Sequence, residues 1–278
     1  MESLRPLLTT YAYNILGVLE EAKDVVQDAF LKFMHIDGDK IEDKKAYLIR
    51  TVINLSINQK KKQKKLVADY PGQWLPEPVA TEKADTAVLR KEVLSYSLMV
   101  LLEKLDAKQR AVFILKEAFD YEHGEIADVL GITEEYSRKI LSRAKNQLKA
   151  DVPIAEKSIP AGYLDKYLYV IRDGDTEQLE KLLTADITVI SDGGGKVAAF
   201  MNPIIGKKPV TAVLLGIYKK FYHKLHIEQR WINQQPALFY YQDGKLVNCQ
   251  IFSFTNGHAD HIFFIRNPDK LKSLENSF

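Results

Sequence analysis

Cysteine is almost absent from this sequence. Among 278 residues there is one, Cys249, so no disulfide can form within the chain and no site built from several thiolates can hold a metal. Cys249 lies in an apolar stretch, and a free cysteine in such a place usually acts as a small core residue. The sequence therefore excludes a disulfide-stapled scaffold, and we expect neither a metal nor another cofactor.

Long apolar runs are also missing. No stretch approaches the roughly 18 consecutive apolar residues that a membrane-spanning helix needs. The first 16 residues lack a basic leader followed by a continuous apolar run, so they do not resemble a secretion signal. We therefore expect a cytoplasmic protein that makes no contact with a membrane.

A large excess of charge of either sign is absent, because the net charge is only +2. Whole-chain charge therefore points to no particular partner. The composition, with 46% apolar and 27% charged residues, is that of a globular protein. At roughly 100–200 residues per domain, 278 residues predict two or three domains.

Two helices are expected near the N-terminus. From about Glu20 to Met34, apolar residues recur at spacings of three and four, which is typical of a helix with one buried face. Residues 35–45 are polar and predict a loop. A second helix is expected from about Lys44 to Lys60, and a lysine-rich run continues from there to residue 65. Such a run can contact phosphates, although most charged runs are only solvated.

Residues 67–85 break the helical pattern with three prolines and a glycine around Trp74 and Leu75. Because proline favours extended conformations in its predecessor, this segment is expected to be a linker. Two interpretations of Trp74 remain open. It covers a local apolar spot, or the linker docks on another part of the protein.

Residues 122–145 predict a helix-turn-helix. Gly131 suits the left-handed conformation of a tight turn, and Thr133 can cap the second helix. Tyr136 is expected to be buried with two aliphatic neighbours, which leaves a basic face for the DNA major groove. The alternative is an ordinary helical hairpin with a solvated face. The exposed face is predicted to carry Ser137, Arg138, Lys139 and Arg143.

The sequence pattern changes after Pro153, from helical to a mixture of helix and strand. Two helices over about 162–183 and a third over about 210–225 are expected, with a short β-type run at 187–190. Four strand-like stretches follow, and Asp243–Gly244 separates two of them as a typical hairpin turn. Helices followed by an antiparallel sheet predict an α+β domain.

Several of these segments resemble a known family. The segments beginning at Leu4, Ala22 and Lys45 resemble the second domain of extracytoplasmic-function sigma factors, and residues 102–148 resemble their fourth domain. The motifs WLPEP at 74–78, DGGGK at 192–196 and NPDKL at 267–271 resemble hallmarks of one subgroup. That subgroup carries a C-terminal SnoaL-like extension, a cone-shaped α+β fold.

The resemblance implies a multidomain chain with two all-α domains and an α+β cone. We expect sigma domain two at residues 1–66, a linker at 67–85 and sigma domain four at 86–150. A second linker is expected at 151–159 and the SnoaL-like domain at 160–278. The implied function is alternative sigma factor activity, and the implied partners are core RNA polymerase (its β′ clamp helices and β subunit) and promoter DNA.

The resemblance also implies roles for individual residues. The helix at 20–34 should dock on polymerase through Asp24, Gln27, Asp28, Phe30 and Leu31. The loop at 35–45 and the next helix should open and read the −10 element, through Tyr47, Arg50, Asn54, Asn58, Lys60, Lys61 and Lys62. The second helix of the helix-turn-helix should read the −35 element. Because lysine lacks the planar fork of arginine, the lysines are expected to hold phosphates rather than to specify bases.

The extension is expected to regulate the sigma domains directly. We hypothesise that its two motifs contact the sigma domains or the Trp74 linker and hold domains two and four in a compact arrangement. The residues expected at this contact are Trp74, Leu75, Pro76, Asp192, Gly193, Gly194, Gly195, Lys196, Asn267, Pro268 and Asp269.

Two alternatives for the extension stay open. SnoaL-like folds include isomerases, so a base among His258, Asp260 and His261 with a hydroxyl of Tyr240 or Tyr241 would give an enzyme fused to a DNA-binding regulator. A small-molecule ligand in the cone would give a sensor. We expect no catalytic residues and a role in protein–protein regulation.

Overall fold

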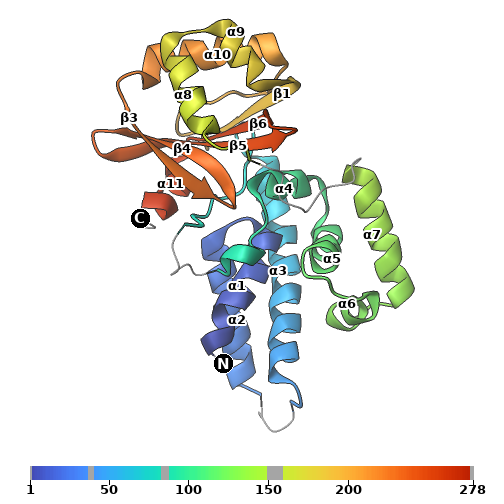
Figure 1. Cartoon of the computed structure of the whole chain (residues 1–278). Helices are drawn as coiled ribbons and strands as arrows, with labels where there is room; N and C mark the ends of the chain where they lie inside the picture. The colour runs from blue at the N-terminus through green and yellow to red at the C-terminus, as the bar shows by residue number, and fades with distance from the viewer. Residues whose placement is uncertain (1, 37–40, 83–87, 149–158, 276–278) are drawn as a thin grey trace. The chain divides into compact units, whose positions relative to one another are not determined.

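The computed structural model describes residues 2–36, 41–82, 88–148 and 159–275. Contacts divide the chain into two compact units. Figure 1 shows the chain coloured from blue at the N-terminus to red at the C-terminus. The first unit holds residues 1–69, 84–94 and 98–154, and the second holds 70–83, 95–97 and 155–278. The WLPEP segment thus folds with the C-terminal unit. Among the described residues, no helix is long and apolar enough to cross a membrane.

The first unit begins with three mutually packed helices, α1 (Arg5–Leu16), α2 (Leu19–Met34) and α3 (Lys44–Ala68). Helix α1 ends at Gly17, whose φ of 78° closes the helix in the left-handed conformation. Helix α2 has the bounds that its apolar spacing predicted. Helix α3 extends beyond the predicted end at Lys60, because the lysine run continues the helix.

The rest of the first unit consists of shorter helical elements. The 3₁₀ turn η3 (Arg90–Glu92) is followed by α4 (Tyr96–Leu101) and η4 (Leu102–Lys104). The first two residues of α4 belong to the second unit. Helices α5 (Ala107–Glu117), α6 (His123–Leu130) and α7 (Glu134–Leu148) follow. Asp106 begins α5 with a capping box, and α3 packs against both α5 and α6.

The second unit combines helices with one sheet of six strands. The helices are α8 (Tyr163–Asp173), α9 (Thr176–Lys181), α10 (Lys207–Ile217) with the π-turn η5 (Tyr218–Tyr222), and α11 (Pro268–Glu275). The strands are β1 (Leu183–Asp192), β2 (Ile204–Ile205), β3 (His226–Ile232), β4 (Gln235–Gln242), β5 (Lys245–Thr255) and β6 (His258–Ile265). This is the α+β architecture that the SnoaL-like resemblance implies.

The sheet order is β2-β1-β6-β5-β4-β3. The four strands over residues 226–265 pair antiparallel, as the sequence predicted, and β1 adds to them through a parallel pairing with β6. Strands β1 and β6 are neighbours in the sheet but lie far apart in the sequence, so the local pattern could not reveal their pairing. The hairpin turn between β4 and β5 is confirmed, because Asp243 and Gly244 both have positive φ, 51° and 76°.

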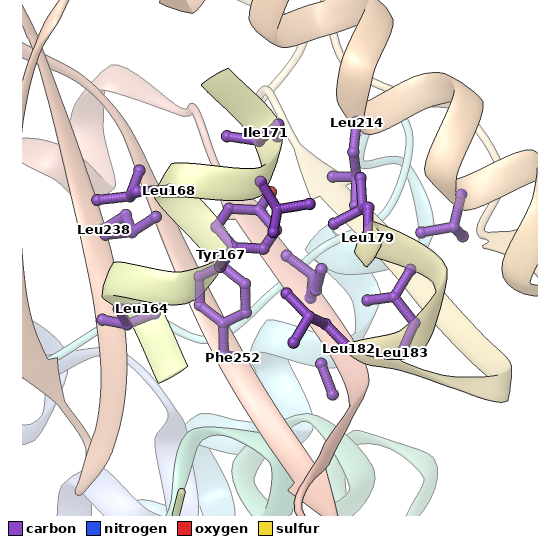
Figure 2. Packing of buried hydrophobic residues seen from close by; sticks show 14 of the residues in the cluster. Leu164, Tyr167, Leu168, Ile171, Leu179, Leu182, Leu183, Leu214, Leu238 and Phe252 are labelled. Carbon is purple, nitrogen blue, oxygen red and sulfur yellow. The ribbon is translucent and has the colours of Figure 1, made fainter. Parts of the chain in front are cut away.

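The core of the second unit lies between helices α8, α9 and α10 and one face of the sheet. Figure 2 shows Leu164, Tyr167 and Leu168 of α8 lying over Leu238 of β4 and Phe252 of β5. Burying such apolar surface stabilises the fold by about 25 cal/mol per Å². This burial is the main force that holds α8 on the sheet.

Candidate polymerase, promoter and linker surfaces

The exposed face of α2 carries the residues predicted to dock on a protein partner. Asp24, Gln27 and Asp28 are exposed, and Leu31 retains 44% of its accessible surface. Phe30 instead belongs to the core, with the Arg5 guanidinium 4.8 Å from its ring centre. Phe30 thus lies on the apolar side of the helix, and its role in binding a partner stays a prediction.

Helix α3 carries the surface predicted to contact the −10 element. Arg50, Asn58, Lys61 and Lys62 are exposed along it. Tyr47 is half-buried against Phe33, with ring centres 5.9 Å apart. The preceding loop includes residues 37–40, which lie outside the described residues.

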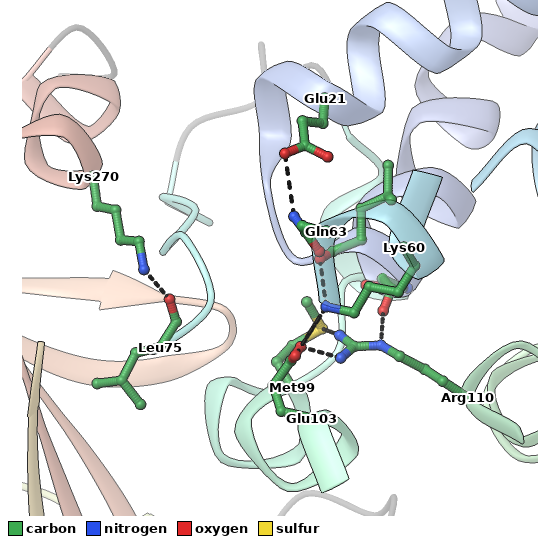
Figure 3. Close-up of polar contacts among 10 residues, drawn as sticks. Glu21, Lys60, Gln63, Leu75, Met99, Glu103, Arg110 and Lys270 are labelled. Atoms are coloured by element: carbon green, nitrogen blue, oxygen red, sulfur yellow. Dashed lines mark hydrogen bonds and ion pairs between the residues drawn. The ribbon is translucent and has the colours of Figure 1, made fainter. Parts of the chain in front are cut away.

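Two further residues of that surface are covered. The Asn54 amide donates to the carbonyl of Val129, at the end of α6, over 2.8 Å. The Lys60 ammonium donates to the Leu16 carbonyl and to both Glu103 carboxylate oxygens, each over 2.9 Å (Figure 3). Lys60 is therefore buried within its own unit and does not offer a phosphate contact in this conformation, contrary to the prediction.

Burial also changes the acidity of Lys60. Desolvation, together with the nearby Arg110 guanidinium, lowers the pKa of the Lys60 ammonium from 10.5 to about 8, although Glu103 opposes the shift. Because the folded-state pKa is depressed, the unfolded chain binds more protons than the folded chain at pH values between the two.

The contribution of Lys60 to the free energy of unfolding should therefore rise from about pH 8 to pH 10.5. We expect the stability difference between wild type and Lys60→Met to shift in favour of wild type over that range, measured by urea denaturation. Lys61→Met, which removes an exposed neighbour, is the control and should show no such slope. A flat difference for Lys60→Met would contradict the depressed pKa.

The predicted helix-turn-helix consists of α6 and α7. Gly131 ends α6 in the left-handed conformation with a φ of 62°. The Thr133 hydroxyl then accepts a hydrogen bond from the Tyr136 amide over 3.2 Å, so it caps α7 as expected. Helix α7 buries residues at helical spacing, namely Ser137, Ile140, Leu141, Ala144 and Leu148.

This spacing corrects the predicted recognition face. Ser137 was expected on the exposed face but is fully buried, with its hydroxyl 2.9 Å from Nδ1 of His123. Tyr136 was expected in the core but is 42% exposed, with the Lys108 ammonium 5.4 Å from its ring centre. Ile140 and Leu141 are buried as predicted, so only Tyr136 and Ser137 exchange their expected positions.

The basic residues of α7 remain on the exposed face. Arg138 forms an ion pair with Glu134, and Lys139 forms one with Glu135 over 2.7 Å. Arg143 is exposed one turn further along. Exposed helix pairs at this spacing contribute only about 0.3–0.5 kcal/mol, so a phosphate or base can displace the acidic partner.

In the second unit the linker is held by a buried carboxylate. Asp192, at the end of β1, is fully buried, and its Oδ1 accepts from the Tyr70 hydroxyl over 2.6 Å. Its Oδ2 accepts from the backbone amide of Leu75 over 3.0 Å and from the Lys270 ammonium over 2.6 Å. We call Tyr70, Leu75, Asp192, Asn267 and Lys270 the linker clasp.

Trp74 and Lys270 complete this contact. The Lys270 ammonium lies 4.4 Å from the Trp74 ring centre. It also donates to the Leu75 carbonyl, as Figure 3 shows. A cation over an aromatic face in a partly desolvated site contributes about 1–2 kcal/mol. Of the two interpretations of Trp74, docking of the linker is therefore the one that the structure supports.

The glycine turn and the NPDKL motif shape the clasp. Asn267 begins α11, where its Oδ1 accepts from the Asp269 amide and its Nδ2 donates to the Tyr70 hydroxyl over 2.9 Å. A Cβ atom on Gly194 would lie 2.4 Å from the Asn267 side chain, and one on Gly195 would lie 2.4 Å from Pro71. These close approaches require glycine. At the surface, Lys196 pairs with Asp269 over 2.5 Å.

Comparisons with known proteins agree with this geometry. Models of sigma-70 region 2 and sigma-70 region 4 match residues 1–66 and 95–148. The ECF RNA polymerase sigma factor SigJ of Mycobacterium tuberculosis is 28% identical over 263 residues, which cover 92% of this chain and 80% of SigJ. The probable sigma factor SigI of the same organism is 25% identical over 284 residues, covering 97% and 93% of the two chains.

A solved structure extends the similarity to the whole fold. The crystal structure of SigJ superposes with a TM-score of 0.79 at 25% identity, covering 98% of this chain and 97% of that one. The chain is an extracytoplasmic-function sigma factor.

Sequence reasoning missed Arg110 and Glu103, two residues that help to join regions 2 and 4 of this sigma factor. The Arg110 side chain is fully buried; its Nε donates to the Asn14 carbonyl of α1 over 3.0 Å, and its guanidinium pairs with Glu103. Glu103 in turn binds Lys60 of α3 (Figure 3). The available signal was an arginine inside the apolar run of α5, because a charge there needs a buried partner.

The residues considered for catalysis in the SnoaL-like unit do not converge. Tyr240 is buried in the cone, where its hydroxyl donates to Gln250 over 2.6 Å. His261 stacks on Phe263, whereas Ile262 belongs to the cone core, so alternation along β6 places His261 on the other face. His258 is exposed. Among the described residues, no group of three or more His, Cys, Asp or Glu side chains is placed to hold a metal.

Proposed function

We propose that this sigma factor is controlled by its own C-terminal unit, which binds the linker between regions 2 and 4. The observation that carries the proposal is the linker clasp, in which buried Asp192 binds Tyr70, the Leu75 amide and Lys270. A linker held at this point restricts the separation of the two promoter-binding regions. The C-terminal unit then acts by protein contact, without catalysis.

The contacts within the first unit support a closed, weakly active state. Asn54 and Lys60 of region 2 are bound to Val129 and Glu103 of region 4. Promoter binding through these side chains requires the two regions to part. We infer that release of the linker favours this opening and raises promoter-specific initiation.

The proposed polymerase-binding face is the exposed side of α2. Acidic and amide groups there, with Leu31 beside them, suit a basic partner with an apolar spot, such as the clamp helices of the polymerase β′ subunit. For the promoter, we propose the −10 contacts at Arg50, Asn58, Lys61 and Lys62, and the −35 contacts at Arg138, Lys139 and Arg143. Tyr136 replaces Ser137 on that −35 face.

The double variant Asp28→Ala with Leu31→Ala should bind core RNA polymerase at least about tenfold more weakly, because one exposed charge and one apolar anchor are lost. Run-off transcription from the cognate promoter should fall in proportion. Both side chains are exposed, so the thermal transition should not change.

The matched control is Tyr169→Ala with Asp173→Ala, an exposed aromatic–acidic pair on α8. Wild-type affinity for polymerase in the Asp28/Leu31 variant would contradict the proposed docking face. If the wild-type chain bound promoter DNA tightly but gave no initiation with core polymerase, the proposal as a whole would fail.

A further inference from the structure

The turn between β3 and β4 contains a fully buried asparagine. Asn233 and Gln234 form a two-residue hairpin turn with positive φ values of 47° and 60°. Side chains in such turns are normally solvated, yet Asn233 has no exposed surface. Its burial indicates that another segment packs over the turn.

That segment is the end of the linker. The Asn233 side-chain oxygen accepts from the Val79 amide over 2.9 Å, and the Asn233 amide donates to the Val79 carbonyl over 3.0 Å. The Thr81 amide donates to the Trp231 carbonyl over 3.0 Å, with Ala80 bridging antiparallel to Ile232. Residues 79–81 therefore add to the edge strand β3, in the way that a peptide adds to an exposed sheet edge.

The neighbouring Gln235 holds the start of α4. Its Oε1 accepts from the Ser97 amide over 2.9 Å, and its Nε2 donates to the Ser97 hydroxyl over 3.2 Å. The first amides of a helix have no partner within the helix, so this side chain satisfies one of them. Beside it, the fully buried Tyr96 packs on Phe263 and donates to the Pro76 carbonyl over 2.7 Å.

The match to sigma-70 region 4 begins at residue 95, so this contact holds the first turn of that region. We propose that the β3–β4 turn, through Asn233 and Gln235, is a second regulatory contact, which binds residues 79–81 and 95–97 of the same chain. It acts separately from the linker clasp and sets the distance between regions 2 and 4 that the promoter must match. This inference rests on the proposed regulation by the C-terminal unit.

The test is the double variant Asn233→Gly with Gln235→Met in the full-length chain. Glycine keeps the positive φ of the turn, and methionine keeps the size of Gln235, so the side-chain hydrogen bonds to Val79 and Ser97 are lost while the turn conformation is retained. The matched control is Asn256→Gly with Gln242→Met. It alters an exposed asparagine with a φ of 51° in the β5–β6 turn and an exposed glutamine at the end of β4.

Amide hydrogen exchange at Val79 and Ser97 should become about tenfold faster in the first variant, while exchange at Leu75 in the clasp stays as in wild type. Run-off transcription from promoters with the −10 to −35 spacer lengthened or shortened by one base pair should show a relaxed spacing preference. The control variant should match wild type in both measurements.

Unchanged exchange at Val79 and Ser97, or faster exchange with an unaltered spacing preference, would overturn the second contact. Slower or faster exchange throughout β5 would show that the unit had been damaged, and Gln235→Met alone would then be measured against the same criteria. If clasp variants change transcription while this variant does not, the proposed regulation survives and only the second contact is lost.

Discussion

Replacing Asp192 with asparagine should destabilise the C-terminal unit by about 3–5 kcal/mol and release the linker. The carboxylate accepts from Tyr70, Leu75 and Lys270, and also from the Gly194 amide over 3.0 Å. Asparagine offers one acceptor oxygen and turns an NH₂ group toward two of these donors. It also leaves the buried Lys270 ammonium without its counter-charge.

Urea denaturation would measure the loss of stability. The fluorescence of Trp74, in a Trp231→Phe background, would measure the release of the linker. Run-off transcription with core polymerase should rise in the same variant, because the linker no longer restrains regions 2 and 4. The matched control is Asp269→Asn, which breaks the Lys196 pair, where both side chains are more than half exposed. Exposed pairs contribute about 0–1 kcal/mol, so that change should be small. Equal effects of the two substitutions would mean that burial gives the clasp no special strength.

Elements with strong local patterns could be predicted from the sequence. The apolar spacing of α2 gave its bounds, and the Gly131 and Asp243–Gly244 turns were predicted because only a few residue types tolerate positive φ. The order of helices followed by strands gave the α+β class of the second unit. Each of these features depends on neighbours within a few residues.

Features that depend on distant partners could not be predicted in this way. Lys60 was expected to contact DNA phosphates, but it is bound to the Glu103 carboxylate, which lies 43 residues further along the chain. Strand β1 pairs with β6, although four other strands lie between them in the sequence. On α7 Ser137 is buried and Tyr136 is exposed, the reverse of the prediction, because a small polar residue is accommodated in the core once His123 supplies a hydrogen bond.

The clasp lies between these two cases. Three motifs on separate parts of the chain predicted a contact, and the structure brings Asp192 and Asn267 together with Tyr70 and the Trp74 segment. The sequence did not show that Lys270 would supply the cation, because one lysine within an exposed helix pattern carries no mark of burial. Nor did it predict that the β3–β4 turn would bind the end of the linker.

Arg110→Met should lower the free energy of unfolding of the first unit by about 3–5 kcal/mol, an effect as large as that of Asp192→Asn. Methionine fills a similar volume but leaves the Asn14 carbonyl without its donor and removes one of the two cations that bind Glu103. The remaining Lys60–Glu103 pair is then a weaker connection between regions 2 and 4. Urea denaturation measures the loss, and Lys116→Met on the same helix is the control, since its partner Glu122 is largely exposed.

The same variant should also open the surface predicted to contact the −10 element. With the connection weakened, Lys60 should react with an acetylating reagent several-fold faster than in wild type, while exposed Lys61 and Lys62 react at unchanged rates. A double-mutant cycle with Glu103→Gln separates the ion pair from general damage, because groups in direct contact give non-additive effects. If the two substitutions destabilise additively and Lys60 stays protected, Arg110 only fills space in region 4 and does not hold the two regions together.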